Sequence, residues 1–333
     1  MSLKLGVDGG GTKTECILVD GSGAIMASHR AEGCNPSIVG PKAARRVLTD
    51  AIGALLSSPP AGRPPLSISS TLLCMAGSRI FWREFAAGLA GLGRVIAVDD
   101  SIPVLELATG GGPGLVIHAG TGSFVAARAP LGPVPPDEAV PSNKAVPSNK
   151  AVPFDEAVPF DEAVPFGLVH YAGGLGWRIG DPGSGYDIGR RAVARGLLEL
   201  QGWMPDSGIG GLLQDYTGLK DANAIGRDFN REKTANARTA GLSPEVLRLA
   251  ESGNAAARDI AVESAAELLA LAVRVAARLL PETPAHEVNA GLSGPILTRP
   301  FVARALQERS PFVFKAIGDA PIEGVRRLLA RLG

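Results

Sequence analysis

The sequence predicts an α/β protein built from two lobes of related architecture. Its 333 residues exceed the roughly 100–200 residues of a typical domain, so two domains are expected. Each half also opens in the same way: a short apolar strand runs into a glycine-rich turn, and a second strand follows. These segments are residues 3–19 and 115–128. We place the boundary in the glycine-rich stretch 110–114, which gives lobes of residues 1–113 and 114–333.

The first lobe is expected to begin with three antiparallel strands and to continue with alternating helices and strands. Apolar runs separated by tight turns predict strands at 3–7, 15–19 and 24–29. Later apolar runs predict strands at 67–76 and 95–98. Helical periodicity predicts helices at 38–56 and 81–92, and a short helix that ends near Leu107.

The second lobe is expected to repeat this pattern with more helices. The predicted strands are 115–118, 124–128, 168–171, 287–290 and 312–315. The predicted helices are 186–199, 209–216, 244–251, 255–280, one from about 299, and 322–332.

Residues 137–166 are five near-identical hexapeptides, DEAVPS, NKAVPS, NKAVPF, DEAVPF and DEAVPF. A proline in every repeat cannot donate a hydrogen bond to a neighbouring strand, so a regular strand is not expected. The segment lies between two predicted strands. We interpret it as an exposed, flexible insertion, with a partner-binding arm as the alternative.

Composition and charge limit the classes of partner. Lys plus Arg and Asp plus Glu are 33 each, which gives no reason to expect nucleic acid or an anionic membrane. The three cysteines form no C-x-x-C pair, and their odd, small number argues against a disulfide framework. The most apolar long segment, 255–280, carries charges at helical spacing and does not suit a membrane span. No signal peptide is recognisable, so we expect a cytoplasmic protein.

Three glycine-rich turns follow strands, at residues 9–14, 120–123 and 291–294. Such turns expose backbone N–H groups that can hold phosphate. None has the spacing of a P-loop, and none is a dinucleotide fingerprint. Asp8 directly precedes the first turn, and a carboxylate beside phosphate-binding amides suits a bound Mg²⁺ ion. The alternative is an aspartate that only caps the turn.

Three further carboxylates are candidate site residues. Asp99 and Asp100 end a predicted strand, where a carboxylate can accept the proton of an attacking hydroxyl. Successive side chains of a strand point to opposite faces, so only one of the two is expected to face a cleft, and the pattern does not choose between them. Asp181 lies in a glycine-rich loop before a helix, where it can bind ligand hydroxyls or cap the helix.

The order of these motifs resembles the N-acetylglucosamine kinase family, within the hexokinase–actin–Hsp70 ATPase superfamily. DGGGTKT at 8–14 and HAGTGSF at 118–124 are similar to its two phosphate motifs. GGLGWRIGDPGSGYDIG at 173–189 is similar to its sugar-side signature, and NAGLSGPI at 289–296 to its adenosine motif. The resemblance covers nearly the whole chain outside 137–166. It implies two ribonuclease-H-like, actin-like lobes with a cleft between them, and residues 318–333 that pack back on the first lobe.

The resemblance also implies an activity and residue roles. The activity is ATP-dependent phosphorylation of N-acetylglucosamine at its 6-hydroxyl, by a homodimer. Asp8 positions Mg²⁺ through water, and Asp100 is the base. The residues implied to bind ATP are Gly10, Gly11, Thr12, Thr14, Gly120, Thr121, Gly122, Ser123, Gly291 and Gly294. The residues implied to bind the sugar are Asn35, Thr121, Gly122, Gly174 and Asp181.

Two positions depart from the family pattern. Leu175 stands where the family has Trp, and Pro182 where it has Glu. Both bear on the choice of sugar, so glucosamine, an N-acetylated muramic or mannose derivative, and glucose are alternatives.

Two other classes of function share the motifs. One is an ATPase that activates a redox enzyme, whose members resemble this family and carry cysteines for an iron–sulfur cluster. The pattern of Cys16, Cys34 and Cys74 does not suit such a cluster. The other is a non-catalytic sugar sensor, whose repressor relatives carry a DNA-binding module before the first strand. The chain begins directly at that strand, so a sensor is not expected.

Overall fold

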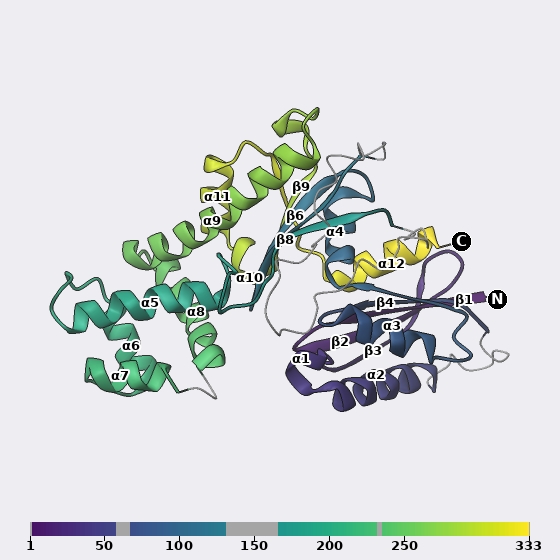
Figure 1. Cartoon of the computed structure of the whole chain (residues 1–333), viewed down its shortest axis with the longest axis horizontal. Helices are drawn as coiled ribbons and strands as arrows, with labels where there is room; N and C mark the ends of the chain where they lie inside the picture. The colour runs from purple at the N-terminus through teal and green to yellow at the C-terminus, as the bar shows by residue number, and fades with distance from the viewer. Residues whose placement is uncertain (1, 58–66, 131–165, 232–234, 333) are drawn as a thin grey trace, which may run out of the picture.

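The computed structural model describes residues 2–57, 67–130, 166–231 and 235–332 of the chain. Within them the strands form two five-stranded sheets, one in the lower and one in the upper part of Figure 1. The strand orders are β3-β2-β1-β4-β5 and β10-β9-β6-β7-β8. Both describe an antiparallel three-strand meander extended by two parallel strands. The repetition confirms the prediction of two lobes with related architecture.

The first sheet lies between α2 on one face and α12 on the other. Its strands are β1 (Ser2–Gly9), β2 (Lys13–Val19), β3 (Ile25–Glu32), β4 (Ser67–Met75) and β5 (Arg94–Asp99). Its own helices are α1 (Pro36–Val39), α2 (Pro41–Leu56) and α3 (Arg79–Ala87). The buried residues of α2 recur every three or four positions, which gives the helix one apolar face against the sheet.

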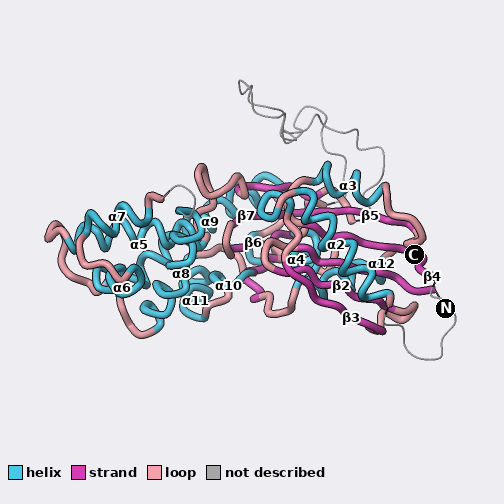
Figure 2. Tube along the Cα trace, turned by 90° about the horizontal axis from the view of Figure 1, so that it is seen from below, coloured by secondary structure: helices cyan, strands magenta, loops and turns pink. Residues whose placement is uncertain are grey.

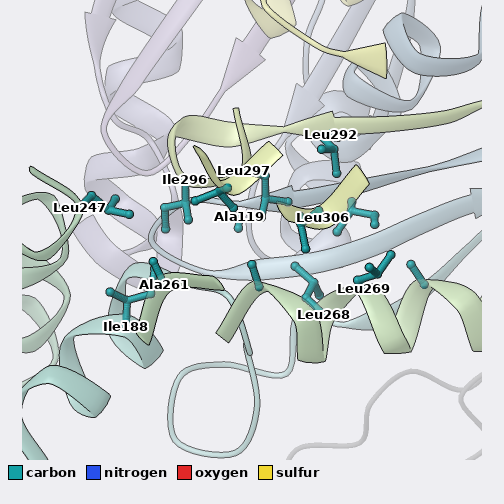
Figure 3. Close-up of a cluster of buried hydrophobic side chains, with 14 of the residues drawn as sticks. Ala119, Ile188, Leu247, Ala261, Leu268, Leu269, Leu292, Ile296, Leu297 and Leu306 are labelled. Carbon is teal, nitrogen blue, oxygen red and sulfur yellow. The ribbon is translucent and has the colours of Figure 1, made fainter. Parts of the chain in front are cut away.

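The second sheet packs against the long helix α9. Its strands are β6 (Gly114–Ala119), β7 (Ser123–Arg128), β8 (Val169–Gly173), β9 (Ala290–Ser293) and β10 (Phe314–Ala316), and its helices are α9 (Ala255–Leu279), α10 (Gly294–Leu297) and α11 (Pro300–Arg309). Figure 3 shows Leu268 and Leu269 of α9 directed at the strands, with Leu306 of α11 completing this core. Strand β9 begins three residues later than predicted, because residues 285–287 form a 3-10 turn.

A layer of four helices extends from the second lobe. These helices are α5 (Gly185–Leu200), α6 (Ile209–Thr217), α7 (Ala222–Phe229) and α8 (Ala235–Glu251). Figure 2 shows the layer at the end of the molecule opposite to both termini. The sequence analysis missed α7, which is short. It also started α8 at Pro244, although this proline lies inside the helix.

Two helices lie between the sheets. Helix α4 (Ser101–Thr109) contacts the second sheet, and the last helix, α12 (Pro321–Arg331), packs on β1 and α4. A Cβ added to Gly6 of β1 would lie 2.7 Å from Val325, so the glycine lets α12 approach the strand closely. The end of the chain therefore returns to the first sheet (Figure 1).

The hexapeptide insertion at 137–166 lies outside the described residues, except for its last residue. Phe166 is only 1% exposed, in a cluster with Ile17, Leu72 and residues of α12. The expectation of an exposed segment is therefore wrong for this phenylalanine. It anchors the chain just before β8.

No helix in the part of the chain that the structure describes is long and apolar enough to span a membrane.

Arg331→Ala is expected to destabilise the protein. Arg331 at the end of α12 is 2.8 Å from the carboxylate of Glu106, which is 3% exposed inside α4. Removing the arginine leaves a buried carboxylate without this partner, at a cost of about 2 kcal/mol in the free energy of unfolding. Urea denaturation measures it. Arg327→Ala removes only surface pairs on the same helix and should cost less than about 1 kcal/mol; an equal loss in the two variants would contradict the account.

Candidate active site

The two sheets present their glycine-rich turns at corresponding edges. In the first sheet β1, β4 and β5 are parallel, so Asp8, Met75 and Asp99 all lie at the carboxyl ends of their strands. In the second sheet, the turn at residues 120–122 follows the carboxyl end of β6, as the turn after Asp8 follows that of β1. Ligands of open α/β sheets bind outside the carboxyl ends of strands, which makes these edges the candidate site.

The first turn joins β1 to β2 and is supported by the segment after β3. The Gly10 N–H donates to the Lys13 carbonyl at 2.9 Å, and the Cys34 N–H donates to the Gly10 carbonyl at 3.1 Å. A Cβ added to Gly33 would lie 2.2 Å from the Gly11 carbonyl oxygen, so only glycine fits beneath the turn. Gly10 and Gly11 are half-buried and Thr12 is exposed at the tip.

Thr14 does not face this turn. Its side chain is fully buried, and its hydroxyl donates to the Glu32 carbonyl at 2.8 Å. This hydrogen bond joins β2 to the end of β3, and contact of Thr14 with phosphate stays a prediction.

Asp8 is a buried carboxylate at the end of β1. It is 6% exposed. Burial raises its pKa to about 7, with a further increase from Glu15 and an opposing decrease from the charge of Lys13. A carboxylate that is costly to ionise here is one that a bound cation would stabilise. Among the described residues, no cluster of three or more Asp, Glu, His or Cys side chains could hold a metal ion. A single carboxylate such as Asp8 is enough for a Mg²⁺ site, because that ion commonly takes one or two carboxylates and completes its coordination shell with phosphate and water.

The Asp99 carboxylate accepts hydrogen bonds from two residues, Arg79 and Ser101. Its Oδ2 accepts from Arg79 Nε at 3.2 Å, and its Oδ1 accepts from the Ser101 hydroxyl at 2.7 Å and the Ser101 N–H at 3.2 Å. Three donors therefore occupy the carboxylate and hold it at the start of α4.

Asp100 has a different environment. No Lys, Arg or His forms an ion pair with it among the residues that the structure describes. Burial, then the charges of Asp99 and Asp8, raise its pKa to about 8. Of the two adjacent aspartates, Asp99 is paired with an arginine and Asp100 is not, which favours Asp100 as a proton acceptor.

The second turn is joined to the long glycine-rich loop. The Ser123 hydroxyl donates to the Pro182 carbonyl at 2.6 Å, and the Gly185 N–H donates to the Gly120 carbonyl at 2.8 Å. Ser123 is buried, so its hydroxyl holds the loop and is not presented to a phosphate. Thr121 is exposed at the tip of the turn.

Asp181 lies where the loop meets this turn. Its Oδ1 accepts from the Gly176 N–H at 3.3 Å, and its Oδ2 lies 3.2 Å from the position of a Cβ added to Gly122. It is the one residue other than glycine with a positive φ in the described ranges, at 64°. Such backbone strain in a non-glycine residue is common at ligand sites. Burial raises the pKa of Asp181, against a decrease from the Gly176 hydrogen bond.

Asn35 lies in the first lobe, directly after Cys34, whereas Gly174 and Leu175 lie in the glycine-rich loop of the second lobe. The Asn35 side-chain oxygen accepts from the Ser37 N–H at 3.0 Å and caps α1, and it packs against Gly77. Gly174 and Leu175 are exposed on the loop, and Leu175 is 63% exposed.

The third glycine motif divides into two parts. Gly294, with φ 89°, begins α10 against the backbone of Ala119. Gly291 lies inside β9, where an added Cβ would be 2.7 Å from Ala108 of α4. Gly291 therefore allows α4 to pack closely on β9, and Gly294 lies at the edge that carries the other turns; contact of the two glycines with adenine stays a prediction.

Sequence analysis missed Arg79, Ser101 and Tyr171. The Tyr171 hydroxyl lies 2.6 Å from the Ser101 hydroxyl, and the Arg79 guanidinium lies over the Tyr171 ring at 4.8 Å. No motif signals these residues, because the contacts join segments far apart in the sequence.

Asp100→Asn is expected to stabilise the protein increasingly as the pH rises. The pKa of Asp100 is about 8 in the folded protein and 3.8 for the free group. Between these values the native state binds more protons than the unfolded state, so the free energy of unfolding falls as the pH rises. Asparagine removes that loss, so the variant should gain nothing near pH 4, and its gain should grow with pH and level off above about pH 8. Thermal denaturation across this range measures the difference; a constant difference would contradict the assignment.

The repeated sheets, each with a glycine-rich turn after its first strand, define a class of fold. The chain has the fold of the actin-like ATPases, with two ribonuclease-H-like lobes. Residues 5–125, about a third of the chain from β1 into β7, match the model of the family described as the BadF/BadG/BcrA/BcrD ATPase family. A search of curated proteins found no significant match to the chain.

Solved structures share the fold over the full length. A candidate N-acetylglucosamine kinase from Chromobacterium violaceum is 24% identical, with 99% of each chain covered and a TM-score of 0.64. A candidate N-acetylglucosamine kinase from Porphyromonas gingivalis is 21% identical, with 98% of each chain covered and a TM-score of 0.64. A ROK family glucokinase from Streptomyces griseus, in complex with glucose and AMPPNP, is 15% identical, with 100% of each chain covered and a TM-score of 0.52. At these identities the likeness establishes the fold.

Proposed function

We propose that the protein is a kinase that transfers the γ-phosphoryl group of ATP to a hydroxyl of a sugar. The observation that carries the proposal is the environment of Asp100: a buried carboxylate of raised pKa, directly after β5, close enough to Asp8 for the two charges to interact. Phosphoryl transfer needs mainly positioning, charge stabilisation and a group that orients the acceptor hydroxyl. A base, a cation-binding carboxylate and two glycine turns are the parts such a reaction uses.

In this proposal Asp100 orients the sugar hydroxyl and takes its proton as the oxygen attacks phosphorus. The N–H groups of Gly11 and Thr12 in one lobe, and those of Thr121 and Gly122 in the other, would bind phosphate oxygens. The N–H groups of Gly10 and Gly120 donate instead to the carbonyls of Lys13 and Gly122, within their own turns. Asp8 would hold Mg²⁺, which supplies positive charge at the phosphates when bound. Approach of the lobes would exclude water, which otherwise competes with the sugar as acceptor.

The proposed sugar is N-acetylglucosamine, phosphorylated at the 6-hydroxyl. Asn35, Gly174 and Asp181 are the proposed sugar contacts. Two solved structures of this fold are candidate N-acetylglucosamine kinases, and the loop at 173–189 resembles the sugar-side signature of that family. Leu175 replaces the family's tryptophan and offers a flexible aliphatic surface to a sugar face or an acetyl methyl group.

A panel of sugars tests the substrate. ADP release with Mg²⁺-ATP is measured with N-acetylglucosamine, glucosamine, N-acetylmannosamine, N-acetylmuramic acid and glucose. The highest kcat/KM is expected with N-acetylglucosamine. A higher value with another sugar would keep the kinase and reject the substrate, and Leu175→Trp then tests whether this position is the cause.

An activator ATPase is the second candidate, because the matched family includes ATPases in its description. The cysteines argue against an iron–sulfur cluster of the kind that such activators carry. Cys16, Cys34 and Cys74 are all 0% exposed, and burial raises the pKa of each thiol. A buried, protonated thiol is a poor metal ligand. Iron in the purified protein would favour the activator.

We further propose that the kinase acts in the cytoplasm as a homodimer, with lobes of residues 1–113 and 114–333, of which residues 318–333 pack on the first lobe. Sedimentation equilibrium tests the dimer.

A further inference from the structure

Four side chains beside Asp100 form a closed ring of contacts across the two lobes. The Tyr171 hydroxyl contacts Ser101, Ser101 donates to Asp99, Arg79 donates to Asp99, and the Arg79 guanidinium lies over the Tyr171 ring. We refer to Arg79, Asp99, Ser101 and Tyr171 as the cross-lobe ring. Three members come from the first lobe and its crossing helix, and Tyr171 comes from β8 of the second sheet.

The direction of the hydrogen bonds follows from the chemistry. The Ser101 hydroxyl donates a hydrogen bond to the Asp99 Oδ1 at 2.7 Å, and a hydroxyl has one hydrogen to donate. The Tyr171 hydroxyl must then donate to the Ser101 oxygen at 2.6 Å. Ser101 is 1% exposed, so these bonds form away from water, where each member strengthens the next.

The ring fixes the backbone that carries the base. Asp99 is the last residue of β5, Ser101 is the first of α4, and Asp100 is the residue between them. Asp99 and Ser101 are both held by side-chain hydrogen bonds, whereas the Asp100 side chain makes no helix-capping bond. Holding both neighbours restricts the backbone at Asp100 and therefore the direction of its carboxylate.

The ring also holds the positively charged guanidinium of Arg79 in contact with Asp99 and Tyr171. Arg79 is the arginine at the start of α3, and its Nε is 3.2 Å from Asp99 Oδ2. With its guanidinium also placed over the Tyr171 ring, Arg79 has two contacts that hold it away from Asp100. A free arginine beside Asp100 would pair with the base and lower its basicity.

We propose that Arg79 and Tyr171 are positioning residues for phosphoryl transfer, acting on Asp100 through Asp99 and Ser101, so that the second lobe orients the base of the first. The inference rests on the proposed function. It predicts that the cost of breaking the ring appears in kcat, because the ring touches neither the glycine turns nor the glycine-rich loop.

Tyr171→Phe tests the inference, since it removes one hydroxyl and keeps the aromatic ring under Arg79. We expect kcat for sugar phosphorylation to fall about tenfold, with the KM values for ATP and sugar changed less than about twofold. The matched control is Tyr216→Phe. Tyr216 also donates its hydroxyl, to the Arg238 carbonyl at 3.1 Å, and also lies under an arginine, but it belongs to the helical layer. Its kcat should equal that of the wild type.

A double-mutant cycle distinguishes positioning from general stability. If Tyr171 acts through Asp99, Tyr171→Phe should change kcat less than about twofold in an Asp99→Asn background. Hydrogen exchange provides a readout that needs no activity: the amides of residues 99–102 should exchange faster in Tyr171→Phe than in wild type and in Tyr216→Phe.

The outcomes are distinct. Wild-type kcat in Tyr171→Phe, additive effects in the cycle, or unchanged exchange at 99–102 would each overturn the inference and leave the kinase proposal intact. ADP release by the wild type that does not depend on sugar would overturn the proposed function itself, and it is read before any variant is made.

Discussion

Asp100→Asn is expected to reduce kcat for sugar phosphorylation by about a thousandfold, the scale of losing a positioned base. Asparagine keeps the size and polarity of the side chain but cannot accept the proton of the attacking hydroxyl. Binding of ATP should be unchanged, because the phosphate-binding turns are separate from the β5–α4 junction. Steady-state ADP release and nucleotide binding measured by calorimetry give both quantities on one preparation.

Asp99→Asn is the matched variant for this experiment, because it makes the same chemical change one residue away. Asp99 already accepts from Arg79 and Ser101, so its loss should cost only about tenfold through misplacement of Asp100. The reverse ranking, with Asp99→Asn the less active enzyme, would show that the other carboxylate is the base.

Asp8→Asn is expected to lower kcat/KM for Mg²⁺-ATP by about a hundredfold or more, because removing one preorganised charge-stabilising group typically has this effect. The buried Asp8 carboxylate has a pKa of about 7, and a bound cation would lower that pKa and repay the cost of burying the charge. Raising the Mg²⁺ concentration should recover part of the lost activity.

Asp215→Asn is the control for Asp8→Asn. Asp215 is exposed on α6 in the helical layer, and its substitution should leave kcat/KM and its Mg²⁺ dependence unchanged. Activity of Asp8→Asn equal to that of this control at every Mg²⁺ concentration would remove Asp8 from the proposed metal site.

The sheets were predictable because short apolar runs between turns are a strong local signal. The run at 3–7 and the glycines that follow it became β1 and its turn, and the run at 115–118 became β6. The signal failed where structure depends on distant packing. Helix α8 runs through Pro244, and α7 buries only Ile225, Asp228 and Phe229.

The site was predictable in outline but not in the orientation of its hydroxyls. Thr14 and Ser123 have the residue type and place of phosphate contacts, yet their hydroxyls donate to the carbonyls of Glu32 and Pro182. These partners come from other strands and loops. The choice between Asp99 and Asp100 likewise depends on Arg79 and Tyr171, which the fold brings to the junction from α3 and β8.

The most direct test of the central claim is the coupling between ADP release and sugar phosphate. ADP and phosphorylated N-acetylglucosamine are quantified together in one reaction with Mg²⁺-ATP, beside an identical reaction without sugar. The account predicts equal molar amounts of the two products and almost no ADP without sugar. ADP release of similar rate in both reactions, with no sugar phosphate formed, would contradict it and identify the protein as an ATPase of another kind.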